Sequence, residues 1–172
     1  MKKIIIILTV AFSCIAANAQ DNLKGSWSNT QSVMGTTINE VLTFDSALSG
    51  NVENKASINL SANMMGAKLE GEMEMSIKGT FEYKDGQLVI KWDRESIQQR
   101  TVKPIEYYYK GEPVPEMKAE MEKVMAAVLD DLKKTALEED NYESVTFKKG
   151  KLTLTERDEK GKKHSETYTF VN

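Results

Sequence analysis

The chain has 172 residues, of which 23 are basic and 26 are acidic, and its formal charge is therefore −3. This balance argues against a nucleic-acid-binding protein, which normally carries a basic face. The single Cys excludes an internal disulfide framework, and the single His excludes metal sites built on several histidines.

The N-terminus has the pattern of a secretory signal peptide. Lys2 and Lys3 precede an apolar run over residues 4–17, and Ala17-Asn18-Ala19 provides a small-x-small cleavage site. The run is too short for the ~20 residues that cross a bilayer, so a transmembrane anchor is the weaker interpretation. We therefore predict residues 1–19 to be a signal peptide and the protein to be exported, either periplasmic or secreted.

Cleavage after Ala19 would leave 153 residues with a formal charge of −5 and no cysteine. A chain of about 150 residues can bury roughly 68–70% of its unfolded surface, enough for a core without disulfides. The segment ending at Cys14 loosely resembles a lipobox, so a lipoprotein anchored through Cys14 is the minor alternative.

Three segments alternate between apolar and polar side chains, as half-buried strands do. They cover residues 36–44, 52–62 and 69–83. The third is the clearest, with apolar residues and glycines on one face and Glu70, Glu72 and Glu74 on the other. A straight strand of this length would span ~50 Å, so we expect it to bend at Gly71 or Gly79.

Turn signals join these strands to others. Asp85-Gly86 predicts a hairpin into an alternating segment over residues 88–92. Lys149-Gly150 and the region of Lys160 and Gly161 separate three further strands at 144–148, 151–157 and 163–171. Sequential hairpins with one apolar face predict an antiparallel meander, which forms a small barrel if it closes.

One segment has helical rather than strand periodicity. Apolar residues recur at helical spacing over 116–137, after Pro113 and Pro115. Acidic residues stand near its start and Lys133 and Lys134 near its end, as the helix dipole favours. We predict one long helix that packs on a face or mouth of the β structure, within a single domain over residues 20–172.

Leu23-Lys24-Gly25-Ser26-Trp27 opens the first strand after the signal peptide. Gly25-x-Trp27 resembles the signature of lipocalins and of lipocalin-like exported proteins of the Bacteroidetes type. The resemblance implies a calycin-type barrel in which Gly25 allows a tight chain entry and Trp27 plugs the closed end. The last strand lacks the Arg that packs over the motif Trp in that family, and the helix precedes three strands instead of following the eighth. A variant barrel and a strongly curved sheet covered by the helix therefore both stay open.

The sequence gives little support for a catalytic site. His164 and Ser165 are neighbours on a predicted strand, so they point to opposite faces and cannot act as a base and nucleophile pair. The stripe of Glu70, Glu72 and Glu74 is typical of a solvated strand face rather than a metal site. No Gly-rich phosphate loop is present. We expect no enzyme activity, no catalytic residue, no metal and no cofactor.

A binding surface has more support. Flexible methionines suit adaptable apolar sites, although an apolar stripe is more often ordinary core. The helix would add Met121 and Met125 as part of a lid. The candidate lining residues of the strands and their surroundings are Met73, Met75, Phe81, Tyr83, Trp92, Arg94, Tyr107 and Tyr109.

Arg94 continues the face of Trp92. Without a bulge, Arg94, Gln98 and Arg100 would point to the interior or its rim, where a buried Arg must be paired with Glu106, Glu95 or a carboxylate-bearing ligand. With a bulge near Asp93, these side chains would be exposed instead.

Asp45-Ser46-Ala47 lies in the turn after a strand. It resembles the acceptor of periplasmic O-glycosylation in Bacteroidetes, which makes Ser46 a possible modification site.

Two function classes follow. The first is non-enzymatic binding of a small apolar or amphipathic, lipid-like ligand in an exported lipocalin-like barrel. The second is a protein-interaction or inhibitor module whose barrel is filled by side chains and holds no ligand.

Overall fold

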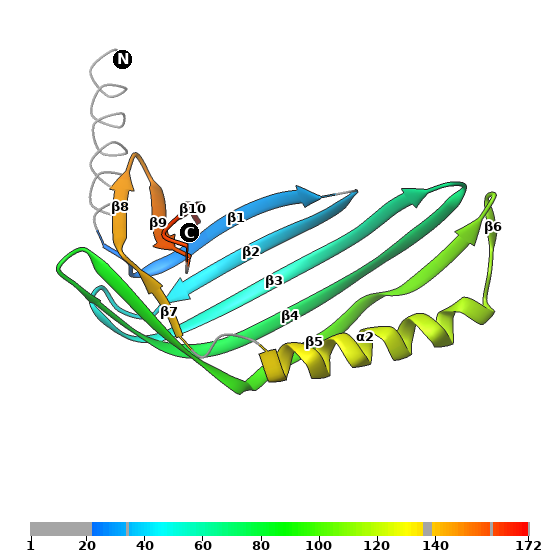
Figure 1. Ribbon diagram of the computed structural model, residues 1–172, viewed down its shortest axis with the longest axis horizontal. Helices are drawn as coiled ribbons and strands as arrows, with labels where there is room; N and C mark the ends of the chain where they lie inside the picture. Colours follow the sequence, from blue (N-terminus) through cyan, green and yellow to red (C-terminus); the bar gives the residue numbers. More distant parts are fainter. Residues whose placement is uncertain (1–21, 34, 136–138, 159, 172) are drawn as a thin grey trace, which may run out of the picture.

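A computed structural model describes residues 22–33, 35–135, 139–158 and 160–171. The predicted signal peptide, its cleavage site at Ala19 and Cys14 lie outside these residues. The described chain is mainly β, as predicted, and forms one antiparallel sheet of ten strands with one helix (Figure 1). The elements are β1 (Gly25–Val33), β2 (Thr36–Phe44), β3 (Ser49–Met64), β4 (Ala67–Lys84), β5 (Gln87–Tyr109), β6 (Glu112–Pro113), α2 (Glu116–Thr135), β7 (Glu139–Tyr142), β8 (Ser144–Lys148), β9 (Lys151–Arg157) and β10 (Lys163–Val171).

Tight turns set the register of the meander. Asp85-Gly86 and Lys149-Gly150 both connect paired strands, as predicted, and both residues of each turn have positive φ. Paired positive φ values are typical of the type I′ turn, whose twist matches that of the flanking strands. Met65-Gly66 and Lys110-Gly111 form two more turns of this kind, which were not predicted from the sequence.

The sheet is not a closed barrel. Its strand order runs β6-β5-β4-β3-β2-β1-β10-β9-β8, with β7 paired to β5 beside this path. At one end, β7 pairs with β5 and β8 pairs with β9, and only Glu143 separates β7 from β8. This segment therefore leads from β5 to β9. The Val145 amide also donates to the Gly86 carbonyl. In the wing, no strand of the part of the chain that the structure describes joins the open edge of β1 to the open edge of β5. The strongly curved sheet is therefore the better description.

The expectation of one long helix is wrong. α2 has 20 residues, ends at Thr135, and packs mainly against β5, whereas β5 itself has 23 residues. Figure 1 shows α2 beside one half of β5, away from β7–β10. The acidic residues Glu139 and Asp140, which disfavour a helix C-terminus, belong to β7. α2 therefore covers one margin of the sheet and does not cross it.

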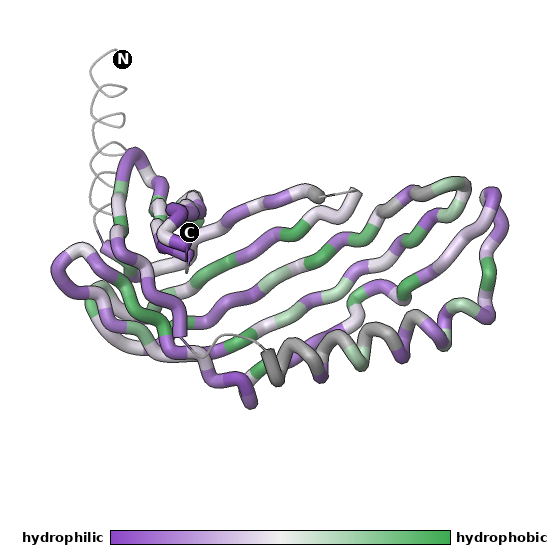
Figure 2. The backbone as a smooth tube through the Cα atoms, viewed as in Figure 1, coloured by the Kyte–Doolittle hydropathy of each residue, from purple (hydrophilic) through white to green (hydrophobic). Residues whose placement is uncertain are grey.

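Long strands divide the molecule into two regions. We call the first the head: it holds one core of buried apolar residues, gathered where β7–β10 meet the ends of β1–β5. We call the second the wing: residues 29–39, 55–77 and 93–135, where β1–β5 extend away from that core beside α2 (Figures 1 and 2). The head core consists of Leu23, Trp27, Leu42, Phe44, Val52, Phe81, Leu88, Ile90, Val145, Leu152, Leu154 and Tyr168.

Candidate functional site

One face of the sheet is continuous from the head core into the wing, and we call it the inner face. Cross-strand pairing aligns Phe44 with Val52 in the head, and further along it aligns Ile38 with Ile58 and Ile58 with Met73. Because side chains of one face recur every second residue, this row continues the core face along β2, β3 and β4. Ile38 and Ile58 are only half-buried, whereas Met73 is 3% exposed.

The Gly25-x-Trp27 motif lies in the head. Trp27 is fully buried, its Nε1 donates to the Leu23 carbonyl at 2.8 Å, and its ring contacts Phe147 and Phe170. Gly25 has φ of +119°, and a Cβ there would lie 2.6 Å from the Phe170 ring. A side chain at this position would therefore displace the ring that packs on Trp27.

Three predicted lining residues belong to the head rather than to a cavity. Phe81 is 4% exposed and packs edge-on against Phe44, with ring centroids 4.9 Å apart. Tyr83 packs against Phe147 in the same way. The Trp92 Nε1 donates to the Asp140 carboxylate of β7 at 2.6 Å. These side chains fill the head and tie β7 to β5.

A polar cluster lies on the inner face where the head gives way to the wing. The Tyr168 hydroxyl is 2.8 Å from a Glu166 carboxylate oxygen and 3.2 Å from a Glu40 carboxylate oxygen. The other Glu40 oxygen accepts from the Asn54 amide at 2.6 Å. One phenol proton can serve only one of the two carboxylates at a time. The geometry therefore favours a proton on whichever of the two carboxyl groups does not accept from the Tyr168 hydroxyl.

Burial acts in the same direction. Desolvation, together with the negative charges of Glu166 and Asp140, raises the pKa of Glu40 above its usual value despite the hydrogen bonds from Asn54 and Tyr168. Burial and nearby carboxylates also raise the pKa of Tyr142 and of Tyr168. Glu40 and Tyr168 were not among the residues predicted from the sequence, although their position on apolar strand faces was a usable signal.

A groove of about 400 Å³ lies between β5 and α2. Ile105 forms part of its floor at 8% exposure, and Met73 and Ile97 are buried nearby on the same sheet. Met75 and Met73 pair with Gln99 and Thr101, which line the groove. The side chains of Met121 and Met125 lie outside the described residues. The inner groove, as we call it, is lined by Gln99, Thr101, Pro104, Ile105, Lys118, Glu122 and Ala126.

β5 bulges between Asp93 and Gln98. Lys78 pairs with Asp93 and Ser76 with Gln98, so one residue of β4 opposes four of β5. The Ser96 hydroxyl donates to the Asp93 carbonyl within the bulge at 2.6 Å. Arg94 lies in this irregular segment and is half-buried. The bulge reverses the predicted face of Arg100, which pairs with Glu74 on the outer face at 3.5 Å.

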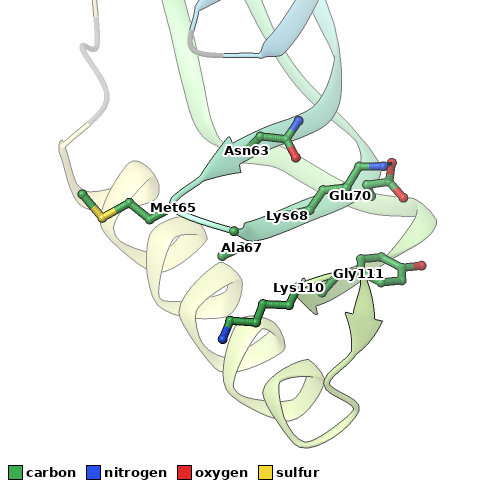
Figure 3. Close-up of a pocket in the computed structure, with 9 residues that line it drawn as sticks. Asn63, Met65, Ala67, Lys68, Glu70, Lys110 and Gly111 are labelled. Carbon is green, nitrogen blue, oxygen red and sulfur yellow. Dashed lines mark ion pairs between the residues drawn. The ribbon is translucent and has the colours of Figure 1, made fainter.

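The tip of the wing holds a second pocket of about 610 Å³ (Figure 3). Met65 and Lys110 extend there from two neighbouring hairpins, and Lys68 forms an ion pair with Glu70. Tyr109 is 48% exposed and lies against the Lys110 ammonium, whereas Tyr107 is half-buried. These two tyrosines therefore lie at the tip, apart from Trp92 in the head.

Ser46 lies in the β2–β3 turn, and its hydroxyl donates to the Ser49 carbonyl. Asp45 caps the same turn by accepting from the Asn51 amide at 2.8 Å. The turn is at the molecular surface, and O-glycosylation of Ser46 stays a prediction.

His164 is exposed, and its Nε2 lies 3.3 Å from an Asp158 carboxylate oxygen. Within the described ranges, no group of three or more His, Cys, Asp or Glu side chains is arranged to hold a metal ion. Among those same residues, no helix combines the length and apolar character needed to cross a membrane.

No known family model matches the chain, and no curated protein or solved structure is similar enough to be counted as a relative. The resemblance of Gly25-x-Trp27 to lipocalins therefore stays a prediction.

Proposed function

We propose that the protein is an exported, non-enzymatic binding protein that holds a small apolar or amphipathic ligand on the inner face of the wing. The observation that carries this proposal is the inner groove, which lies between an apolar strand floor and a helix that packs mainly against one strand. Its volume of about 400 Å³ lies within the usual range of small-molecule sites, roughly 300–1,000 Å³.

The lining supports an amphipathic occupant. Ile105 and Pro104 offer an apolar floor, whereas Lys118 and Glu122 from α2 place opposite charges at the rim. A few polar groups around an apolar site typically orient a ligand. Because α2 packs mainly against β5 and contributes no residue to the head core, a displacement of α2 would leave the contacts within that core in place.

The lipocalin-like proposal changes in one respect. Large side chains such as Trp27, Phe44 and Tyr168 fill the interior of the head. The proposed ligand therefore lies outside the head, in the wing.

A fluorescence titration with N-phenyl-1-naphthylamine, an uncharged apolar probe, tests the proposal. Thr101→Phe would fill the groove, because Thr101 is exposed on its floor. The larger ring would occupy space that the probe needs, so we expect probe affinity to fall about tenfold or more, on the order of 1.4 kcal/mol. Val102→Phe is the matched control, because Val102 is the exposed neighbour on the same strand and does not line the groove.

Equal affinity of both variants would contradict binding at this groove. Mass spectrometry of an organic extract of the purified protein would then identify any ligand that co-purifies.

The second candidate function is a protein-interaction module with a filled interior, which the packed head core favours. Absence of probe binding together with an empty extract would support this alternative over ligand binding.

A further inference from the structure

The edge of β1 in the wing has an open side. β1 pairs with β10 only from Ser26 to Ser28, but it continues to Val33 and pairs with β2 along its whole length. Beyond Ser28, no strand of the described ranges lies on this side of β1. Figure 1 shows this half of β1 as an outer strand of the wing.

The backbone groups of Thr30 and Ser32 point to this open side. In an antiparallel pair, alternate residues direct their N–H and C=O groups to the same neighbour. The Phe170 amide donates to Gly150, which is the β9 side, so Thr169 and Val171 direct their groups to β1. Their partners Ser28 and Ser26 therefore belong to the row that continues through Thr30 and Ser32.

The side chains of this row do not cover the edge. The Thr30 hydroxyl donates to the Asn39 side chain of β2 at 2.9 Å, and the Ser32 and Thr37 hydroxyls are 3.3 Å apart. Both side chains are thus bonded across to β2, which leaves the backbone groups of the edge accessible.

Within the residues that the structure describes, this edge also lacks the features that normally protect a strand edge, namely charged side chains, proline, bulges or a covering helix. No Asp, Glu, Lys or Arg lies between Gly25 and Asn39, although 28% of the chain is charged. The corresponding edge of β5 has all four, with Arg94 in a bulge, Lys103, Pro104 and α2. The free part of β10 carries Lys163 and Glu166.

We propose that β1 pairs antiparallel with β1 of a second copy of this chain, so that two wings form one continuous sheet. An uncharged strand suits this partner, because self-pairing would place like charges opposite each other on a charged strand. The pairing is isologous and closes at two copies, because the other open edge is protected. This interface is independent of the proposed ligand.

Light scattering after size-exclusion chromatography would measure the assembly of the purified protein. We expect a dimer for the natural chain. Thr30→Lys combined with Ser32→Lys places two cations on the paired edge, and it should weaken the dimer about tenfold or more. Thr37→Lys combined with Asn39→Lys adds the same charge to β2 on the same face and should leave the dimer intact.

Amide hydrogen exchange supplies a second readout, which reports on the edge itself. In the dimer, the Thr30 and Ser32 amides should be as protected as the Gln31 amide, which points to β2. In the monomeric Lys variant, amides 30 and 32 should exchange fast while Gln31 stays protected.

Three results would overturn the proposal: a natural chain that is monomeric at all concentrations, a dimer whose Thr30 and Ser32 amides exchange fast, or equal weakening by both Lys pairs. A monomer would direct the search towards an extended peptide of another protein as the occupant of this edge.

Discussion

The head and the wing share the strands β1–β5 but are stabilised differently. In the head, Trp27, Phe44 and Tyr168 are almost completely buried, and aromatic rings contact one another at 4.9–6.4 Å. In the wing, the buried apolar side chains of the described residues are Met73, Ile97 and Ile105. The wing therefore depends on its backbone ladder and α2 for much of its order.

Ion pairs do not compensate for this difference. Lys103 pairs with Glu72 at 3.0 Å and Arg100 with Glu74 at 3.5 Å, but the Lys and Arg side chains are at least 70% exposed. Exposed pairs of this kind contribute little to stability. Binding regions are commonly drawn from the less stable part of a fold, so the contrast is consistent with a head that supplies stability and with the proposed binding in the wing.

Trp27→Ala should produce the largest loss of stability. It removes a fully buried ring, the bond to the Leu23 carbonyl and two aromatic contacts. Truncation of a buried Trp costs ~3–5 kcal/mol. Urea denaturation followed by circular dichroism would measure it. Ile105→Ala in the wing is the comparison, and an equal loss there would contradict the division between the regions.

Gly79→Ala tests the boundary between the regions and should have the next largest effect. A Cβ at Gly79 would lie 2.4 Å from the Lys91 carbonyl oxygen and 3.0 Å from the Trp92 ring, so β4 and β5 would have to separate. We expect a loss of about 1–3 kcal/mol in the free energy of unfolding.

Gly86→Ala is the matched control for this prediction. Gly86 has positive φ, but a Cβ added there would meet no heavy atom within 4 Å, so its cost is backbone strain alone, roughly 1–2 kcal/mol. The Gly79 variant should also weaken the bond between Trp92 and Asp140, which a change in tryptophan fluorescence would report. An unchanged spectrum would contradict the proposed contact.

Local signals explain how much of this fold the sequence could predict. β4 alternates with period two over most of its length, and Asp85-Gly86 is a strong hairpin signal, so the meander and several of its registers could be predicted. These features depend on neighbouring residues, which is why one sequence is enough to identify them.

The unpredicted features follow either from an irregular strand or from contacts between distant residues. β5 contains Pro104 and a bulge after Asp93, so its alternation fails and the pattern could not predict its 23-residue length. Glu40 and Tyr168 are 128 positions apart, and only the path through β1 and β10 brings them together. Closure of the sheet fails for a similar reason, because nothing local shows that β1 and β10 stop pairing after Ser28 and Thr169.

Glu40→Gln should have the smallest effect, and its sign depends on pH. Burial raises the pKa of Glu40 above its usual value of 4.5, so the folded state retains this proton to higher pH than the unfolded state does. The stabilisation from Glu40 is therefore fully present below pH 4.5 and is lost as the pH rises through the folded-state pKa. Gln is uncharged at every pH and can still hydrogen-bond to Asn54 and Tyr168.

We therefore expect Glu40→Gln to match the natural chain in thermal unfolding at acid pH and to exceed it at neutral pH. Glu82→Gln removes the same charge from an exposed position of β4 and should show no such divergence. A Glu40→Gln variant that is less stable at neutral pH would mean that the carboxylate form is preferred, and that Tyr168 donates to Glu40 rather than to Glu166. This cluster lies at the border between head and wing. The pH at which the unfolding temperatures of the variant and the natural chain diverge would therefore also report how strongly burial at this border raises the pKa of Glu40.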